Sequence, residues 1–232
     1  MSIFAIIPAR GGSKGIVRKN LALILNKPLI SFSITAAIKS KLVDRVLVSS
    51  DDEEIIQVAK SFGAEIPFKR PDEISSDQTA MIDVLKHMVN YLVGKNELIE
   101  AIVLLQPTSP LRTEKHIDEA ISKFRSSNAS SVVSVVEVPH QYNPYSVLSL
   151  NQNGELNPIL DKTFNRRQDK PKFYARNGPA ILVVSPSVIL DDELYGSTSL
   201  PYFMTKENSL DIDKKEDLVE ACRILERRKN KL

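Results

Sequence analysis

The stretch IFAIIPARGGSKG (residues 3–15) joins an apolar run to a loop rich in glycine and basic residues. Its first five residues are apolar and include β-branched isoleucines, which is typical of a buried strand. The glycines that follow, Gly11, Gly12 and Gly15, allow close backbone approach and positive φ, so that successive N–H groups can face an anion. Arg10 and Lys14 add positive charge. The stretch therefore predicts a buried strand that ends in a loop suited to a polyphosphate.

Four further apolar runs of the same kind follow along the chain, at residues 45–50, 101–106, 131–138 and 180–185. Segments with helical periodicity accompany them, at about 28–40, 52–62, 79–93, 113–126 and 214–229. Strands that alternate with helices of this length indicate βαβ units with right-handed crossovers. We therefore expect an α/β fold in which helices cover both faces of a mostly parallel sheet, within a single domain spanning residues 1–232.

The alternation breaks between about residues 139 and 175, where proline, asparagine and aromatic residues occur without a clear helix. Asn153 and Gly154 lie between two alternating runs, which predicts a β-hairpin. A surface loop is one interpretation, but an excursion of this length is unusual in a compact domain unless it covers a site or forms an interface. We therefore expect an inserted hairpin or flap over 139–175.

The composition indicates no global field that would favour nucleic acid. Lys and Arg number 31 against 29 Asp and Glu, for a formal net charge of +2, so any anion site must be local. The single cysteine, Cys222, excludes disulfide frameworks and cysteine-rich metal sites within one chain. The stretch MSIFAIIPAR lacks the features of a signal peptide, and no apolar stretch approaches the roughly 20 residues needed to cross a bilayer. We therefore expect a cytoplasmic protein that binds neither nucleic acid nor membrane.

The glycine-rich loop matches neither of two familiar phosphate-binding patterns. ARGGSKG (9–15) contains neither G-x-x-x-x-G-K-[ST] nor G-x-G-x-x-G. The alternative interpretation is a glycine-rich turn with solvated basic residues, and Arg18 and Lys19 have no assigned partner. Position favours phosphate binding, because ligands of an open parallel sheet lie outside the carboxyl ends of its strands.

Polar residues also follow the later apolar runs. In LLQPTSPLR (104–112), two prolines fix an extended loop, and Thr113 can cap the helix that follows. In KRPDEISSD (69–77), Arg70 offers a planar donor fork for a phosphate or a base carbonyl, whereas Asp77 can cap the next helix. Asp51, in VSSDDEEI (48–55), either caps a helix or helps to position a nucleotide or metal.

Two carboxylates lie close together near the C-terminus. Asp211 and Asp213, in DIDKKED (211–217), are two residues apart, so in an extended segment they share one face. Two such carboxylates can hold Mg²⁺, which keeps several waters and takes phosphate oxygens as further ligands.

Taken in order, these stretches resemble the signature segments of the acylneuraminate cytidylyltransferases, which include the legionaminic and pseudaminic acid enzymes. RRQDKP (166–171) and RNG (176–178) extend the resemblance through the flap, and together the segments span nearly the whole chain. The resemblance implies a nucleotide-diphospho-sugar transferase-like, Rossmann-like fold. It also implies that the chain activates a nine-carbon sugar acid with CTP, releases pyrophosphate and uses Mg²⁺, and that it forms a homodimer or higher oligomer with the flap exchanged across the interface.

The resemblance further implies roles for individual residues. Arg10 and Lys14 are expected to be catalytic, and Asp211 and Asp213 to bind the metal. The residues expected to bind the nucleotide are Ala9, Gly11, Gly12, Ser13, Asn20, Arg70, Asp77 and Thr79. Those expected to bind the sugar acid are Gln106, Arg167 and Arg176, although relatives carry R-x-N-G where Arg176 directly precedes Asn177 here.

Three other functions remain open at this point. A cytidylyltransferase for the eight-carbon acid Kdo shares the fold and mechanism, but its N-terminal loop follows a different pattern. A metal-dependent glycosyltransferase also uses a D-x-D pair, which would then follow a mid-chain strand rather than lie near residue 211. A nonenzymatic nucleotide-binding module would bind CTP without releasing pyrophosphate.

Overall fold

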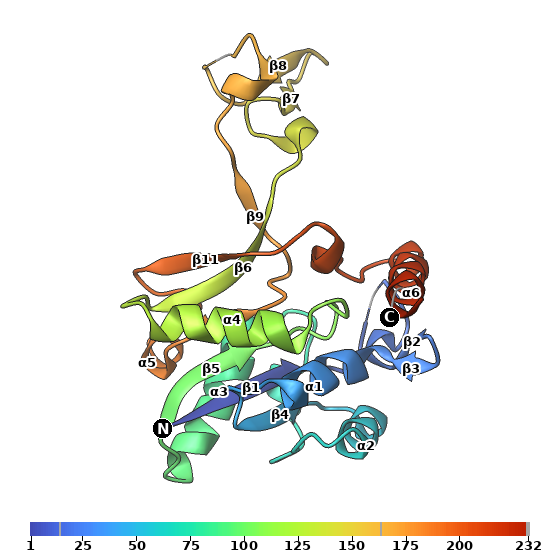
Figure 1. The fold of residues 1–232 in the computed structure, drawn as a ribbon, viewed down its shortest axis with the longest axis vertical. Coiled ribbons are helices and arrows are strands. Elements are labelled where there is room, and N and C mark those ends of the chain that lie inside the picture. The colour runs from blue at the N-terminus through green and yellow to red at the C-terminus, as the bar shows by residue number, and fades with distance from the viewer. Residues whose placement is uncertain (14, 163, 231–232) are drawn as a thin grey trace.

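A twisted central sheet forms the middle layer of the molecule (Figure 1). The computed structural model describes residues 1–13, 15–162 and 164–230. Within these residues the sheet has the strand order β11-β6-β10-β5-β1-β4, with β9 also paired to β6. Its strands are β1 (Ser2–Pro8), β4 (Arg45–Ser49), β5 (Ile99–Leu104), β6 (Ser131–Glu137), β9 (Tyr174–Arg176), β10 (Leu182–Val184) and β11 (Ser199–Phe203).

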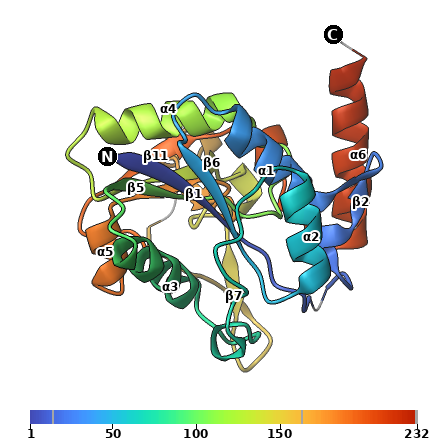
Figure 2. The same cartoon turned by 90° about the horizontal axis from the view of Figure 1, so that it is seen from below.

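Helices cover both faces of this sheet, as predicted, and Figure 2 shows α1 and α4 on one side and α3 and α5 on the other. The alternation of β1 explains the two layers: Ile3, Ala5 and Ile7 belong to one apolar cluster, and Phe4 and Ile6 to the other. The α-helices are α1 (Leu29–Lys39), α2 (Glu53–Ser61), α3 (Met81–Gly94), α4 (Glu114–Arg125), α5 (Pro186–Leu190) and α6 (Lys215–Lys229). The short 3-10 helices are η1 (Lys19–Leu21), η2 (Asp72–Ile74), η3 (His140–Tyr142), η4 (Arg167–Asp169) and η5 (Glu207–Ser209).

The predicted α/β fold class is confirmed, although the sheet is mixed rather than wholly parallel. Strand β1 runs parallel to both β4 and β5, and β11 runs parallel to β6. The predicted run 180–185 becomes β10, which is antiparallel to both of its neighbours. The chain reverses there because it returns from the flap along β6, first as β9 and then as β10.

The flap over 139–175 projects from the sheet on the extended ends of β6 and β9 (Figure 1). The predicted hairpin is present: β7 (Leu148–Leu150) pairs antiparallel with β8 (Leu156–Pro158). Gly154 has φ of 81° in the connecting loop, a conformation that favours glycine. Several large apolar side chains of the hairpin are exposed, among them Leu150 and Leu156.

The C-terminal helix α6 packs against the start of the chain through a third apolar cluster. Ile212 and Ala221 from the C-terminal part meet Ile16, Ile24 and Leu29 from the N-terminal part. Ile24 belongs to the small hairpin of β2 (Leu23–Ile24) and β3 (Lys27–Pro28). This packing brings the segment 211–214 beside the glycine-rich loop, although the two lie almost 200 residues apart in the sequence.

Among the described helices, none has both the length and the apolar character needed to cross a membrane.

Candidate active site

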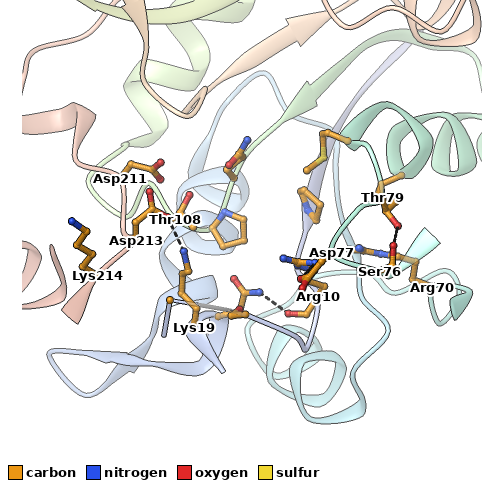
Figure 3. Close-up of a pocket in the computed structure, with 18 residues that line it drawn as sticks. Arg10, Lys19, Arg70, Ser76, Asp77, Thr79, Thr108, Asp211, Asp213 and Lys214 are labelled. Carbon is orange, nitrogen blue, oxygen red and sulfur yellow. Dashed lines mark hydrogen bonds and ion pairs between the residues drawn. The ribbon is translucent and has the colours of Figure 1, made fainter. Parts of the chain in front are cut away.

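A cleft of about 650 Å³ opens where the loops after β1 and β5 meet the segment before α6. Four stretches of chain line it, within 8–20, 70–84, 106–108 and 211–214. In Figure 3, Asp211, Asp213 and Lys19 lie at one end of the cleft, and Arg10, Asp77 and Arg70 at the other. Most of the residues predicted to form the site therefore meet here: Arg10, Ser13, Asn20, Arg70, Asp77, Thr79, Gln106, Asp211 and Asp213.

The glycine-rich loop is shaped by two close approaches of its backbone to other segments. A Cβ on Gly11 would lie 2.7 Å from Asp52 Oδ2, and one on Gly15 would lie 2.5 Å from the backbone oxygen of Asp213. No other described residue lies within 4 Å of a Cβ built on Gly12, and neither Gly11 nor Gly12 has positive φ. The expectation of positive φ is therefore wrong for these two glycines, and close packing is what requires Gly11. The predicted catalytic Lys14 lies outside the described residues.

Two side chains hold the glycine-rich loop in place. Asp51 Oδ1 accepts a hydrogen bond of 3.0 Å from Gly11 N, and Asn20 Nδ2 donates one of 2.9 Å to Arg10 O. Asp51 does not cap α2; that role belongs to Asp52, whose carboxylate accepts from Ile55 N at 2.9 Å. Asp51 and Asn20 therefore fix the single peptide group that joins Arg10 to Gly11, one through its N–H and the other through its carbonyl.

Asp77 pairs with Arg10 across the arginine end of the cleft. Helix α3 begins at Met81 with Ala80 as its N-cap, so the interpretation of Asp77 as a helix cap is wrong. The Thr79 hydroxyl lies 3.0 Å from that of Ser76. A carboxylate thus lies against the guanidinium expected to meet a phosphate.

Arg70 is almost fully buried, with 4% of its surface exposed. Its Nε donates to Ser49 Oγ at 3.0 Å, and its Nη2 donates to Ser49 O. Burial lowers the pKa of Arg70 to about 10, Arg10 acts in the same direction, and Asp51 opposes them. The group still carries its charge at neutral pH, so Arg70 and Arg10 place two positive charges at this end of the cleft, beside the carboxylates of Asp51 and Asp77.

Lys19 lines the cleft, although the sequence analysis gave it no partner. Its Nζ donates to Ile212 O at 2.8 Å and lies 2.9 Å from Asp213 Oδ1. Its neighbour Arg18 has φ of 53° and pairs outside with Asp52 and Glu54. Because the backbone is left-handed at Arg18, the Arg18 and Lys19 side chains point in different directions. No local pattern in the sequence predicts this turn.

Asp211 and Asp213 both reach the cleft, as their spacing predicts. Burial raises the pKa of Asp211 and the Asp213 carboxylate adds to this, while the Thr108 hydroxyl and Lys19 oppose it. Asp211 Oδ1 is buried and makes no hydrogen bond of acceptable geometry in the described part of the chain, and the same holds for Thr108 Oγ1.

Asp211 Oδ1, a carboxylate oxygen without a hydrogen-bond partner among the described residues, lies near the Asp213 carboxylate, and this arrangement suits a divalent cation. No group of three or more acidic, histidine or cysteine side chains capable of holding a metal occurs among the described residues. Two protein carboxylates are nevertheless sufficient for Mg²⁺ when phosphate oxygens and water complete its coordination. The donor set therefore fits Mg²⁺ bound together with a nucleotide.

Other predicted site residues do not reach the cleft of this chain. Ala9 is buried with its N–H bonded to Ser49 O at 2.9 Å, and Gly11 and Gly12 support the loop without lining the cleft. Arg167 lines a separate hollow of about 460 Å³ at the base of the flap. Arg176 places its guanidinium carbon 4.7 Å from the centre of the Tyr195 ring. The projecting flap carries Arg167 away from the cleft, whereas Arg176 belongs to β9 of the central sheet and packs against Tyr195 instead.

A family model described as cytidylyltransferase matches residues 4–230. This chain belongs to the cytidylyltransferase family. A pseudaminic acid cytidylyltransferase of Campylobacter jejuni is 34% identical over 226 residues, which cover 97% of this chain and 96% of that protein. An N-acylneuraminate cytidylyltransferase of Escherichia coli is 31% identical and covers 99% of this chain, which spans only 53% of the length of that relative. A CMP-N,N'-diacetyllegionaminic acid synthase of Legionella pneumophila is 30% identical, covering 92% of this chain and 91% of that protein.

The cytidylyltransferase fold extends to more distant proteins. A solved CMP-2-keto-3-deoxy-manno-octonic acid synthetase, described as complexed with CTP, superposes with a TM-score of 0.73 and covers 98% of this chain and 100% of its own. Its sequence identity is 16%, so this likeness shows the fold alone.

Proposed function

We propose that this cytidylyltransferase joins CTP to a nonulosonic, sialic-acid-like sugar acid, giving the CMP-sugar and pyrophosphate. The observation that carries the proposal is the cleft itself, in which a glycine-rich loop, two arginines and a pair of aspartates converge. The named relatives act on acids of this class. We propose that residues 1–232 form one nucleotidyltransferase domain with the flap inserted at 139–175.

The arginine end of the cleft would receive the nucleotide. Arg70 and Thr79 lie where the base and ribose would enter, and Arg10, which is paired with Asp77, projects from the loop that would carry the triphosphate. Phosphate oxygens would take the place of the Asp77 carboxylate on Arg10, because a triphosphate offers a higher charge to the same guanidinium. Ser13 and Lys14 belong to the same loop.

The reaction is a displacement at phosphorus. The anomeric hydroxyl of the sugar acid attacks the α-phosphorus of CTP, the bond to the β-phosphate oxygen breaks, and the hydroxyl proton leaves to solvent. Lys19 and Arg10 lie at opposite ends of the cleft. They would contribute positive charge on either side of the reacting phosphate. Positioning and electrostatic stabilisation supply most of the rate enhancement in such a transfer.

Asp211 and Asp213 would hold Mg²⁺ at the other end of the cleft. When bound there, Mg²⁺ supplies charge to phosphate oxygens and acidifies a bound hydroxyl. Lys19 Nζ lies 2.9 Å from Asp213 Oδ1 and would hold positive charge beside phosphate oxygens bound near this carboxylate. Gln106, which lines the cleft between the two ends, would contact the hydroxyl or N-acyl groups of the sugar acid.

The flap would act on a second copy of the chain. Its hairpin exposes large apolar side chains, with Leu150 exposed to 69% and Leu156 to 64%, and neighbouring exposed apolar side chains of this kind often form a protein–protein contact. Arg167 lies far from the cleft of its own chain and would complete the sugar site of the partner. We propose a homodimer in which the flaps are exchanged. Changing both leucines to aspartate should yield monomers by light scattering, with activity lost; an active monomeric variant would contradict it.

The test of the reaction is pyrophosphate release with CTP, Mg²⁺ and a nonulosonic acid. Arg10→Ala should reduce kcat by about 100-fold or more, because it removes a charge held against the reacting phosphates. Arg18→Ala is the matched control: Arg18 belongs to the same loop but forms its ion pairs with Asp52 and Glu54 outside the cleft. Near-normal turnover of Arg10→Ala, or an equal loss in both variants, would overturn the assignment of Arg10.

A cytoplasmic location remains a prediction.

A further inference from the structure

A buried arginine lies behind the cleft, outside the set of residues assigned above. Arg112 is 3% exposed and lies at the end of the loop that follows β5. Among the described residues no carboxylate pairs with it, and burial lowers its pKa to about 9. A buried cation without a carboxylate partner lowers stability relative to a well-packed apolar side chain. The stability of the core therefore does not account for a guanidinium at this position.

The hydrogen bonds of Arg112 join three separate segments of the chain. Its Nη1 donates to Ala180 O at 2.8 Å and to Gln106 O at 3.3 Å, and its Nη2 donates to Ser33 Oγ of α1. The Ser33 hydroxyl in turn donates to Gln106 O at 3.2 Å. The guanidinium thus fixes the Gln106 carbonyl from one side while it holds the start of β10 from the other.

The same two segments also meet through the Gln106 side chain. Gln106 Nε2 donates to Gly178 O at 2.9 Å, two residues before the Ala180 carbonyl that Arg112 holds. This bond uses one of the two amide hydrogens and sets which way the amide points. Its geometry depends on the spacing between residue 106 and residues 178–180, and Arg112 bridges that spacing.

We infer that Arg112 is a positioning residue, which holds Gln106 in the orientation that binds the sugar acid. The inference rests on the proposed function, since Gln106 is assigned there to the sugar acid. Arg112 contacts neither substrate and acts only through the Gln106 carbonyl and the 178–180 turn. The groups proposed to bind CTP, namely Arg10, Arg70 and the aspartate pair, make no hydrogen bond with Arg112, so we expect CTP binding not to depend on this network.

A double-mutant cycle tests the inference. Arg112→Lys keeps the charge but cannot form the planar fork, so we expect the KM for the sugar acid to rise about tenfold, the equivalent of one ordinary hydrogen bond. The KM for CTP should stay within about twofold. Gln106→Ala should raise the KM for the acid by a similar factor, and adding Arg112→Lys to it should change nothing further, because coupled residues are not additive.

Two further variants distinguish a loss of positioning from a general loss of folding stability. Ser33→Ala removes the hydroxyl that bridges Arg112 and Gln106, and should raise the KM for the acid by a smaller factor. Leu92→Ala, a buried position of α3 on the opposite face of the sheet, should lower Tm without separating the two KM values.

The outcomes are distinct. Equal rises of both KM values in Arg112→Lys, a pattern like that of Leu92→Ala, or additive effects with Gln106→Ala would each overturn the positioning role. If Arg112→Lys does not fold, an unchanged KM for the acid in Ser33→Ala overturns it instead. If the unaltered chain gives no product with any acid, the proposed function itself is contradicted. If the unaltered chain is active and Arg112→Lys is unaffected, only the positioning role of Arg112 is overturned.

Discussion

Replacing Gly15 by alanine should slow the reaction through a backbone contact rather than through loss of a functional group. A Cβ at this position would lie 2.5 Å from the carbonyl oxygen of Asp213, and the atom it meets is backbone, which cannot rotate away. The glycine-rich loop and the 211–214 segment must therefore move apart. Both carry groups assigned to the reaction, so the change separates the loop that would carry the triphosphate from the aspartates that would hold the metal.

The size of the displacement follows from the contact distance. Ordinary contacts of a Cβ begin at 3.4 Å, so the two segments must separate by about 0.9 Å. A misplacement of about 1 Å in an active site can cost on the order of 100-fold in rate. We therefore expect kcat to fall by about that factor and the Mg²⁺ concentration for half-maximal rate to rise.

Gly12→Ala provides the matched control within the same loop. In the part of the chain that the structure describes, no atom lies within 4 Å of a Cβ on Gly12, and its φ is not positive. Pyrophosphate release by this variant should be within about twofold of the unaltered protein, since an unstrained substitution changes little beyond unfolded-chain entropy. Normal kcat and normal Mg²⁺ dependence in a folded Gly15→Ala variant would refute the coupling of the two segments.

Three further outcomes follow from single contacts. Asp77→Asn removes the carboxylate on Arg10, so the KM for CTP should fall by about two- to fivefold, the strength of an exposed ion pair; a rise in this KM, measured by initial rates, would instead make Asp77 a nucleotide contact. Lys19→Met should reduce kcat by about 100-fold. The Mg²⁺ concentration for half-maximal rate should fall, because Asp213 loses its ion pair with Lys19. An unchanged kcat, measured in a Mg²⁺ titration, would contradict the role of the Lys19 charge in the reaction. Burial lowers the pKa of His116 below its ordinary 6.5, so the stability that neutral His116 contributes is complete above that pH and is lost as pH falls below it. Urea unfolding at pH 7.5 and 5.5 should show a larger loss in the unaltered protein than in His116→Gln, and equal losses would contradict the shift.

The layers of the fold were predictable because they depend on local patterns. The continuous apolar run of β1 predicts a buried strand, and the helical periodicity of the longer segments predicts helices that begin and end within two residues of the observed ones. The direction of β10 was not predictable in the same way. An apolar run is the same read in either direction, and only the return of the chain from the flap makes this strand antiparallel.

The site was predictable where a polar residue directly follows a strand. Arg10 and Gln106 both reach the cleft from such loops. Lys19 was missed because its inward direction depends on the left-handed turn at Arg18 and on a partner 194 residues away. Arg167 and Arg176 share their chemistry with the expected sugar contacts, but neither lines the cleft. The direction in which the flap projects, which no local pattern encodes, moves Arg167 away, and Arg176 packs against the ring of Tyr195.

The most direct test of the proposed reaction is the mass of the product. The protein is incubated with CTP and Mg²⁺ together with one acid at a time: N-acetylneuraminic, pseudaminic, legionaminic or the eight-carbon acid Kdo. The proposal predicts pyrophosphate and a CMP-linked product with at least one of the nine-carbon acids, and none without CTP. A CMP-linked product from Kdo alone would change the substrate class, and binding of CTP without any product would contradict the proposed enzyme activity.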